Sequence, residues 1–386
     1  MKKVLTVFGT RPEAVKMAPV VLALKRRSRE FECKVVVTAQ HRDMLDQVLT
    51  LFGISCDHDL DIMTDGQTLT DVNARALRGL EPILKSEVPD LVLVHGDTTT
   101  TLAAAVAAFY QQIPVGHVEA GLRTHDLMNP FPEEFNRRAA DAVSTLHFAP
   151  TLLAKRNLLR ERVRAEGILV TGNTGIDALR LAVARMRTGQ IRKPASKLQR
   201  LAEQPFILLT AHRRENFGRP LADVCQAIRK IALERRHLHF VYPVHPNPNV
   251  LRPAGEYLSS LANVHLLEPL DYADLIYLMR KAIIVLTDSG GLQEEAPALG
   301  KPVLVLRQLT ERPEAVKAGT VRLVGTDPLR IHRWVTRLLD DARVYRRMAN
   351  AVNPYGDGRA ADRTVEAIRY FLHLRRTPPT EFQVQS

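Results

Sequence analysis

Short apolar segments alternate with helical patterns through the first half of the chain. The apolar segments are brief and rich in β-branched residues, which is typical of buried strands. The expected strands are Val4–Phe8, Lys34–Thr38, Leu91–Val94, Val115–Val118, Thr145–Ala149 and Ile168–Thr171. The expected helices lie around Ala14–Arg27, Arg42–Phe52, Leu69–Ser86, Thr99–Tyr110 and Glu133–Ala142. This alternation predicts βαβ units and a parallel sheet covered by helices on both faces.

The second half of the chain starts the same pattern again. Its expected strands are Phe206–Thr210, Leu238–Val244, Val264–Leu267, Ile283–Thr287, Val303–Leu306 and Val321–Leu323. Its expected helices lie around Pro220–Arg236, Tyr272–Arg280 and Leu292–Leu299. Residues 177–205 are basic and helix-like, and we assign them to the junction between the halves. The sequence therefore predicts two similar α/β domains with a cleft between them.

The length and the apolar segments limit the class of protein. A chain of 386 residues suits two domains. No apolar segment approaches the roughly 18–20 residues of a membrane span, and the first strand leads directly into a turn instead of a signal-peptide pattern. We therefore expect a cytoplasmic protein with no membrane partner. Cys33, Cys56 and Cys225 form no metal or redox pattern, so we expect inert thiols.

The formal net charge of +12 raises the question of a nucleic-acid partner. The basic residues are, however, spread along helical segments such as residues 25–29 and 156–164, and aromatic residues make up only 5% of the chain. No aromatic stacking pattern accompanies the charge. We expect a small phosphate-bearing substrate and no nucleic acid.

Carboxylates follow two neighbouring strands of the first half. Asp97 comes just after the strand ending at Val94, and Glu119 directly follows the strand ending at Val118. Ligands of open α/β sheets bind at the carboxyl ends of the strands. Glu133 and Arg137 lie in the next helix, behind a Pro-rich turn, although acidic residues at a helix start also serve as ordinary dipole complements. Carboxylates and an arginine at one edge indicate proton-transfer chemistry.

Turns at the ends of other strands are suited to phosphate. Arg11 and Lys16 accompany Gly9 at the start of the first helix. A single glycine is not a dinucleotide fingerprint, which disfavours NAD. The turn Ser289-Gly290-Gly291 exposes backbone amides at a helix start, and Glu295 one turn later can accept from ribose hydroxyls. A capped helix with glycines for packing is the alternative reading.

Two further turns carry cations. His212 and Arg213 follow one strand of the second half, and Arg312 follows another in a setting like that of Arg11. A histidine after a strand is often only structural, but basic turns at several strand ends favour a phosphate site. The acidic run at residues 57–61 is expected to be a solvated turn, and no cluster has metal-site spacing, so we expect no metal.

With these residues assembled, the chain closely resembles the non-hydrolysing UDP-N-acetylglucosamine 2-epimerases over nearly its whole length. The motifs that carry the resemblance are Gly9-Thr10-Arg11-Pro12-Glu13, Ala39-Gln40-His41-Arg42, His95-Gly96-Asp97, His117-Val118-Glu119-Ala120-Gly121-Leu122-Arg123, Pro132-Glu133-Glu134, His212-Arg213-Arg214-Glu215-Asn216, Asp288-Ser289-Gly290-Gly291, Thr310-Glu311-Arg312-Pro313-Glu314 and Asn353-Pro354-Tyr355-Gly356-Asp357-Gly358.

The resemblance implies two Rossmann-like domains facing a central cleft, as in the GT-B glycosyltransferases, with the C-terminal helix crossing back to the first domain. On this basis the first domain comprises residues 1–172 and 357–376, the second comprises residues 173–356, and residues 377–386 form a tail that we expect to fray. The resemblance also implies a homodimer that interconverts UDP-GlcNAc and UDP-ManNAc without a cofactor. Such enzymes serve the biosynthesis of cell-surface polysaccharides.

The resemblance assigns roles to individual positions. The catalytic positions are matched by Asp97, Glu119, Glu133 and His212. The nucleotide-contacting positions are matched by Arg11, Lys16, Ser289, Gly290, Gly291, Glu295 and Arg312, and we add Arg137 and Arg213 as further substrate-binding residues. Some bacterial members bind UDP-GlcNAc as an activator, for which Gln40 and His41 form the candidate effector site. Here the chain departs from the pattern, because Gly66 stands where some members have arginine and Gln308 where Asn or Asp is common.

The chemistry explains why such residues are required. The proton at C2 of the sugar is not adjacent to a carbonyl, so the workable route loses UDP from C1 as the proton leaves C2, giving a 2-acetamidoglucal. UDP then adds again while the proton returns to the opposite face, which requires acid–base groups on both faces. The alternatives are a hydrolysing epimerase that releases ManNAc and UDP and a glycosyltransferase of the same fold. A third alternative is a catalytically silent sugar-nucleotide sensor, which would have no need of Asp97 and Glu119.

Overall fold

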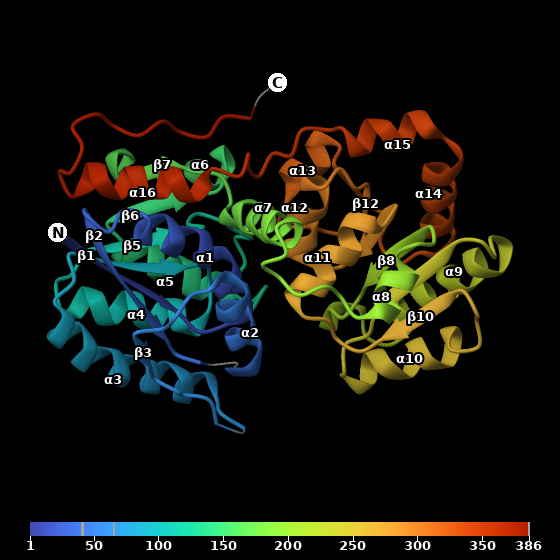
Figure 1. The fold of residues 1–386 in the computed structure, drawn as a ribbon, viewed down its shortest axis with the longest axis horizontal. Coiled ribbons are helices and arrows are strands. Elements are labelled where there is room, and N and C mark those ends of the chain that lie inside the picture. Colours follow the sequence, from blue (N-terminus) through green and yellow to red (C-terminus); the bar gives the residue numbers. More distant parts are fainter. Residues whose placement is uncertain (40–41, 65, 385–386) are drawn as a thin grey trace. The chain divides into compact units, whose positions relative to one another are not determined.

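The computed structural model describes residues 1–39, 42–64 and 66–384, and these form two compact units. Unit 1 comprises Met1–Leu181 and Tyr355–Gln383, and unit 2 comprises Ala182–Pro354 and Val384. Each unit has a parallel sheet and its own helices (Figure 1). None of the described helices is long and apolar enough to cross a membrane.

Unit 1 is built on a seven-stranded sheet with the order β3-β2-β1-β4-β5-β6-β7, in which every pairing is parallel. Its strands are β1 (Lys2–Phe8), β2 (Phe31–Val37), β3 (His58–Asp59), β4 (Leu91–His95), β5 (Val115–Val118), β6 (Leu146–Ala149) and β7 (Ile168–Val170). Its helices are α1 (Arg11–Lys25), α2 (Arg42–Phe52), α3 (Leu69–Glu87), α4 (Thr99–Tyr110), α5 (Glu133–Val143), α6 (Leu152–Arg160), the short η1 (Ala165–Gly167), most of α7 (Thr174–Arg187) and α16 (Ala360–Phe371).

Unit 2 repeats this arrangement with a six-stranded parallel sheet of order β10-β9-β8-β11-β12-β13. Its strands are β8 (Phe206–Thr210), β9 (His239–Pro243), β10 (Val264–Leu267), β11 (Ile284–Thr287), β12 (Val303–Val305) and β13 (Val321–Leu323). Its helices are α8 (Ser196–Leu201), the short η2 (Arg214–Asn216), α9 (Arg219–Glu234), α10 (Pro248–Leu258), α11 (Tyr272–Lys281), α12 (Gly290–Ala298), α13 (Pro313–Ala318), α14 (Pro328–Asp340) and α15 (Ala342–Ala349).

Both sheets have the strand order of Rossmann-like domains. The order reverses between β1 and β4 in unit 1 and between β8 and β11 in unit 2. Such switch points leave a crevice at the carboxyl ends of the strands, where ligands of this fold class bind. The predicted α/β class with two Rossmann-like domains is confirmed.

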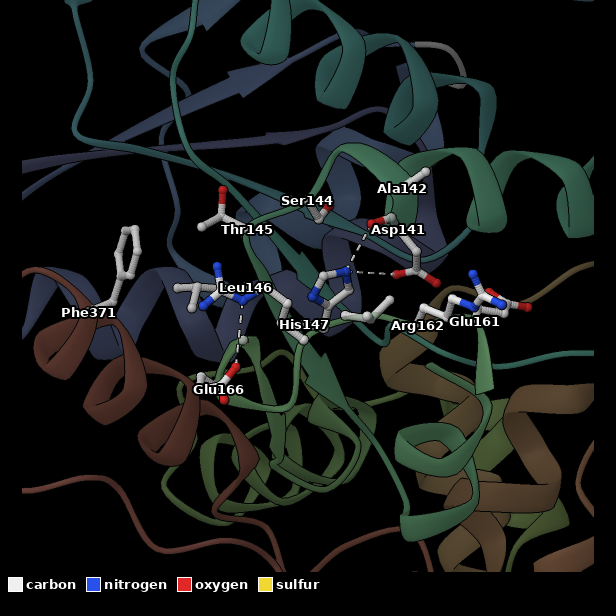
Figure 2. A pocket seen from close by; sticks show the side chains of 13 residues that line it. Asp141, Ala142, Ser144, Thr145, Leu146, His147, Glu161, Arg162, Glu166 and Phe371 are labelled. Atoms are coloured by element: carbon white, nitrogen blue, oxygen red, sulfur yellow. Dashed lines mark hydrogen bonds and ion pairs between the residues drawn. The ribbon is translucent and has the colours of Figure 1, made fainter. Parts of the chain in front are cut away.

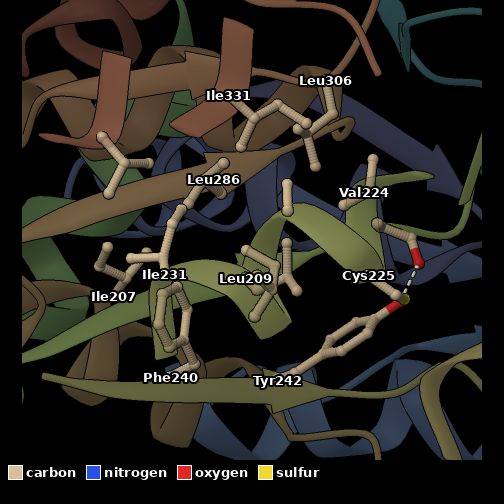
Figure 3. Packing of buried hydrophobic residues seen from close by; sticks show 14 of the residues in the cluster. Ile207, Leu209, Val224, Cys225, Ile231, Phe240, Tyr242, Leu286, Leu306 and Ile331 are labelled. Atoms are coloured by element: carbon tan, nitrogen blue, oxygen red, sulfur yellow. Dashed lines mark hydrogen bonds between the residues drawn. The ribbon is translucent and has the colours of Figure 1, made fainter. Parts of the chain in front are cut away.

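The core of unit 2 shows why the central strands read as continuous apolar runs. Side chains of β8, β9 and β11, among them Leu209, Phe240 and Leu286, pack against Ile231 of α9 with no exposed surface (Figure 3). Strands that are covered on both faces have no polar side to alternate with. Cys225 lies in this cluster, where burial raises the pKa of its thiol to about 12, as expected of an inert thiol.

The boundary between the units differs from the expected one. Residues 173–181 belong to unit 1, because α7 is anchored there. The Asn173 amide nitrogen donates to the Tyr355 carbonyl at 2.6 Å, and Asp177 accepts from the first two amides of α16. The return of the C-terminal helix to unit 1 is confirmed, since α16 packs against α1 and Arg27 pairs with Glu366 at 2.5 Å.

Two smaller expectations are wrong. The acidic run at residues 57–61 is not simply a turn: His58 and Asp59 form the edge strand β3, because Asp57 accepts from the Val35 amide at 2.8 Å and starts the pairing with β2. The tail does not fray at residues 378–383. Phe382 is only 5% exposed and its amide donates to the Val170 carbonyl at 2.7 Å, while Glu381 pairs with Lys155.

Candidate active site

Asp97 and Glu119 lie beside each other at the carboxyl edge of the unit 1 sheet. They follow the adjacent strands β4 and β5, and the Gly96 amide donates to the Val118 carbonyl at 2.9 Å. A Cβ atom on Gly96 would lie 3.9 Å from Oε1 of Glu119. The structure thus brings the two predicted carboxylates to one place.

Three other side chains surround the carboxylate of Glu119. The ammonium of Lys16, from α1, pairs with its Oε2, and Asn173 Nδ2 donates to the same oxygen at 2.8 Å. His95 Nε2 lies 3.9 Å from that oxygen. Burial lowers the pKa of His95 to about 3 even though Glu119 opposes the shift, so this imidazole is neutral. Lys16 stabilises the ionised form of Glu119, as a proton acceptor requires.

The two acidic residues at the start of α5 have different settings. Glu134 is fully buried and accepts from the amides of Thr124 and His125 at 3.0 and 3.1 Å, so it fixes the preceding loop. Glu133 has a buried Oε2 without a hydrogen-bond partner in the described part of the chain. Glu133 is therefore the one of the two that is suited to receive a ligand group.

Arg137, one turn further along α5, ties the helix to the Asp97 turn. Its Nη2 donates to Asp97 Oδ2 at 2.5 Å, and Asn136 Nδ2 donates to the Asp97 carbonyl at 3.0 Å. The arginine is buried, whereas the Asp97 side chain is 30% exposed. Arg137 therefore orients Asp97 while leaving part of its carboxylate accessible.

Glu13 fastens the turn that carries Arg11 to the turn that carries Asp97. One of its oxygens accepts from the amides of Gly9 and Thr10, and the other accepts from the hydroxyls of Thr98 and Thr101 at 2.7 and 3.1 Å. Burial raises the pKa of Glu13 although these hydrogen bonds oppose the shift. The family resemblance assigns no role to Glu13. The structure shows that it links the turns after β1 and β4 at the switch point.

In unit 2, Asp288 organises the turn that carries His212. Its Oδ2 accepts from the amides of His212 and Arg213 at 2.8 Å each and from Asn216 Nδ2 at 3.1 Å. Its Oδ1 is buried without a hydrogen bond among the described residues and lies 3.7 Å from His212 Nδ1. The His212 ring is stacked on His245 with centroids 5.6 Å apart, and its side chain is 41% exposed. Asp288 therefore favours a proton on Nδ1 of His212.

Gly290 and Arg312 meet at the start of α12. A Cβ atom on Gly290 would lie 2.6 Å from Arg312 Nη1, so the glycine makes room for the guanidinium there. Arg312 Nε donates to Glu294 Oε1 at 2.5 Å and its Nη1 donates to Glu311 Oε1 at 2.6 Å. Burial acts to raise the pKa of Glu311, but Arg312 and Arg307 lower it to about 2. A fixed cation thus lies beside the amides of Gly290 and Gly291.

Glu295, one turn into α12, is nearly buried and accepts from the Tyr272 hydroxyl at 3.4 Å. Ser289 is the N-cap residue of α12, and its amide donates to the Thr287 hydroxyl at 2.9 Å. The Ser289 to Gly291 turn therefore begins the helix directly behind β11, as the sequence predicted.

No group of three or more His, Cys, Asp or Glu side chains with metal-site geometry occurs among residues 1–39, 42–64 and 66–384. The candidate effector residues Gln40 and His41 lie outside the described residues.

The sequence analysis missed the residues that hold the site together. Asn173, His245 and Asp288 received no role, although each follows a strand of the sheet. The position of Asp288 directly behind an apolar run was the available signal, the same one that identified Asp97 and Glu119. His95 gives no such signal, because the lowering of its pKa depends on burial.

Comparisons with known proteins agree with this geometry. A family model described as UDP-N-acetylglucosamine 2-epimerase matches residues 22–369. The chain is 55% identical over 377 residues to a UDP-N-acetylglucosamine 2-epimerase of Salmonella typhimurium, covering 96% of this chain and 99% of that protein.

Two solved structures are also similar. One, from Listeria monocytogenes and named as a UDP-N-acetylglucosamine 2-epimerase, has a TM-score of 0.91 at 48% identity, with all of both chains covered. The other, a UDP-GlcNAc 2-epimerase from Neisseria meningitidis bound to UDP-GlcNAc, has a TM-score of 0.87 at 50% identity and covers 95% of this chain and 99% of that chain.

Proposed function

The chain belongs to the UDP-N-acetylglucosamine 2-epimerase family, and we propose that it interconverts UDP-GlcNAc and UDP-ManNAc by eliminating UDP and adding it again. The observation that carries the mechanism is the pair of carboxylates that follow β4 and β5, each paired with its own cation. Arg137 holds Asp97 and Lys16 holds Glu119. A transferase that only activates a leaving group has no need of such a constellation.

The acid–base roles fall to the unit 1 carboxylates. Glu119, ionised beside Lys16, is suited to accept a proton at C2. Asp97 keeps an accessible oxygen, and Glu133 has a buried oxygen without a described partner, so each can donate or accept a proton. We propose that Asp97, Glu119 and Glu133 share the proton transfers on the two faces of the sugar.

The nucleotide roles fall mainly to unit 2. The amides at the start of α12 and the fixed guanidinium of Arg312 favour a diphosphate, which is a double anion that gains charge as it leaves C1. His212 and Arg213 add a donor and a cation, and Glu295 accepts from the ribose hydroxyls. Arg11, at the first position of α1, adds a cation from unit 1.

Two further statements rest on the family resemblance. We propose that the protein acts as a homodimer and that it works in the cytoplasm. The proposed reaction needs no cofactor, since the electron pair left at C2 forms the double bond of the glucal.

The test is to incubate the purified protein with UDP-GlcNAc in heavy water, without added metal or NAD, and to follow the sugar by NMR. We expect UDP-ManNAc with deuterium at C2. Free ManNAc with UDP would identify a hydrolysing epimerase instead, and binding without turnover would favour a transferase that lacks its acceptor.

A further inference from the structure

Asp141, a residue of α5 that has no place in the site described above, contacts the turn that carries Glu119 directly and is connected through His117 to the turn that carries Asp97. Its side chain is 2% exposed. Its Oδ1 lies 2.6 Å from His117 Nδ1, and its Oδ2 accepts from Arg123 Nη2 at 2.7 Å and from the Gly121 amide at 3.3 Å. Gly121 is two residues beyond Glu119.

The second nitrogen of His117 reaches the other turn. His117 Nε2 lies 2.7 Å from the carbonyl oxygen of Gly96, the residue before Asp97. A carboxylate and a carbonyl are both acceptors, and a neutral imidazole can donate from only one of its nitrogens. Both contacts are hydrogen bonds when His117 carries a proton on each nitrogen, and its ring then links the Asp141 carboxylate to the Gly96 carbonyl.

These residues belong to a larger group of charged and polar side chains, the Asp141 cluster, which consists of His117, Arg123, Asp141 and Glu161. Arg123 Nε donates to Glu161 Oε1 at 2.9 Å, so Asp141 and Glu161 share one guanidinium. Burial acts to raise the pKa of Asp141, but the charges of His117 and Arg123 and the hydrogen bond from His117 lower it to about 2. Asp141 is therefore ionised over the whole physiological range.

The backbone at these turns requires support. Glu119 has a φ of +67°, which a residue with a side chain rarely adopts, and Gly96 and Gly121 have φ values of +71° and +86°. A non-glycine residue in this region costs about 1–3 kcal/mol unless its surroundings hold it there. The amides of Glu119 and Ala120 donate to the Phe148 carbonyl, and the Gly121 amide donates to Asp141. The conformation that presents Glu119 therefore depends in part on Asp141.

We propose that Asp141 is a positioning residue for the epimerisation, which fixes Asp97 through His117 and Gly96 and fixes Glu119 through Gly121. This inference rests on the proposed function. Asp141 touches no substrate, and it acts by keeping two proton-transfer groups from separate strands at a constant distance from each other.

The same cluster provides a matched control. Figure 2 shows Asp141, His147 and Glu161 at a pocket of about 620 Å³ at the end of α5. Glu161 shares Arg123 with Asp141 and is 27% exposed, but the described contacts of its side chain are with Arg123 and Arg138 and not with Gly96 or Gly121. A change at Glu161 alters the charge of the cluster without releasing Gly96 or Gly121.

The experiment compares Asp141→Asn with Glu161→Gln in steady-state epimerisation and in UDP binding by calorimetry. We expect Asp141→Asn to lower kcat by about 100-fold, the effect of misplacing a reacting group by around 1 Å. Its KM for UDP-GlcNAc and its Kd for UDP should stay within about threefold, because the nucleotide contacts are elsewhere. Glu161→Gln should keep kcat within about threefold of the unchanged protein.

Other outcomes overturn the inference. Asp141→Asn with an unchanged kcat would do so, and so would an equal loss in Glu161→Gln, which would point to the charge of the cluster alone. If Asp141→Asn does not fold, NMR of the unchanged protein with ¹⁵N-labelled histidine decides the matter: a His117 ring without a proton on Nε2 would remove the link to Gly96. If the unchanged protein itself does not epimerise, the proposed function fails, whatever these variants do.

Discussion

Glu119 combines an unusual backbone conformation with a carboxylate that two other side chains hold. Its φ is +67°, and its carboxylate receives the Lys16 ammonium and the Asn173 amide. A residue that served only the core would have no reason to keep a buried ion pair at the end of a strand. The arrangement instead fits a proton acceptor, for which the placement of the carboxylate matters more than its contribution to the stability of the fold.

Replacing Glu119 with Gln keeps the shape of the side chain and removes its ability to take a proton. We expect the rate of epimerisation to fall by about 10²–10⁴-fold, the usual contribution of a general base. UDP binding, measured by calorimetry, should change by less than about threefold, since most of the proposed nucleotide contacts lie on unit 2. A variant with an unchanged rate would exclude Glu119 from the mechanism.

Single-residue signals were only partly readable in the sequence. Asp97, Glu119 and Asp288 all follow apolar runs, and the first two were identified on that ground. Asp141 was not, because its partners His117 and Arg123 are 24 and 18 residues away and meet it only in the folded chain. The neutrality of His95 likewise depends on burial, which no local pattern reveals.

At the start of α12, the space at Gly290 determines where the Arg312 guanidinium can lie. Gly290→Ala would bring a Cβ atom to 2.6 Å from Arg312 Nη1, whereas nothing described lies within 4 Å of a Cβ atom on Gly291. We expect Gly290→Ala to lower the free energy of unfolding by about 1–3 kcal/mol, because the buried guanidinium must leave its carboxylate partners.

The control for this prediction is Gly291→Ala, which should leave the stability unchanged or raise it by up to about 1 kcal/mol, since alanine is the better helix former. Thermal melting of both variants without ligand makes the comparison. Equal effects at the two positions would show that Arg312 does not depend on the space at Gly290.

The start of α16 makes stability depend on pH. Asp177 accepts from the amides of Ala360 and Ala361, and burial raises its pKa from 3.8 to about 6 despite these bonds. The folded state thus binds a proton more tightly than the unfolded state does. The contribution of Asp177 to the free energy of unfolding is present in full below pH 4 and is lost as the pH rises through 6. The loss amounts to up to roughly 3 kcal/mol.

Asp177→Asn cannot ionise and should lack this loss. Urea unfolding between pH 4 and pH 7 would measure the free energy of unfolding of both proteins. The value for the variant should rise relative to that of the unchanged protein as the pH rises. A constant difference across that range would contradict the raised pKa.

At the scale of elements, the sequence located the strands of both sheets to within a few residues, because buried parallel strands read as apolar runs. The edge strand β3 and the helices α6, α10, α13, α14 and α15 were missed. The strand β3 has only two residues and no apolar pattern, and α10 contains Pro253 in its interior. The Asn247 cap before Pro248 was a readable start signal for α10.

The whole molecule consists of two similar units, and the chain returns to the first of them at its end. Residues 355–383 belong to unit 1. The polar composition of the last residues predicted fraying, but one aromatic side chain changed the outcome, since Phe382 is buried and Arg363 lies over its ring at 5.4 Å from the centroid.

Phe382→Ala should therefore destabilise unit 1 by about 3 kcal/mol, the cost of removing a buried aromatic ring. Calorimetry would record the lower transition. Trp334, the single tryptophan of the chain, lies in α14 of unit 2, so its fluorescence transition should change little. Val384→Ala, at a side chain that is 46% exposed, is the control. An unchanged melting profile in Phe382→Ala would mean that the tail contributes nothing to unit 1.

The central claim is that the bond between C1 and the diphosphate breaks in every epimerisation event. UDP-GlcNAc labelled with ¹⁸O in the oxygen that bridges C1 and the β-phosphorus tests this directly. During incubation with the protein, we predict that the label spreads to the non-bridging oxygens of the β-phosphate, which ³¹P NMR detects. Formation of UDP-ManNAc with the label kept entirely in the bridging position would contradict the account.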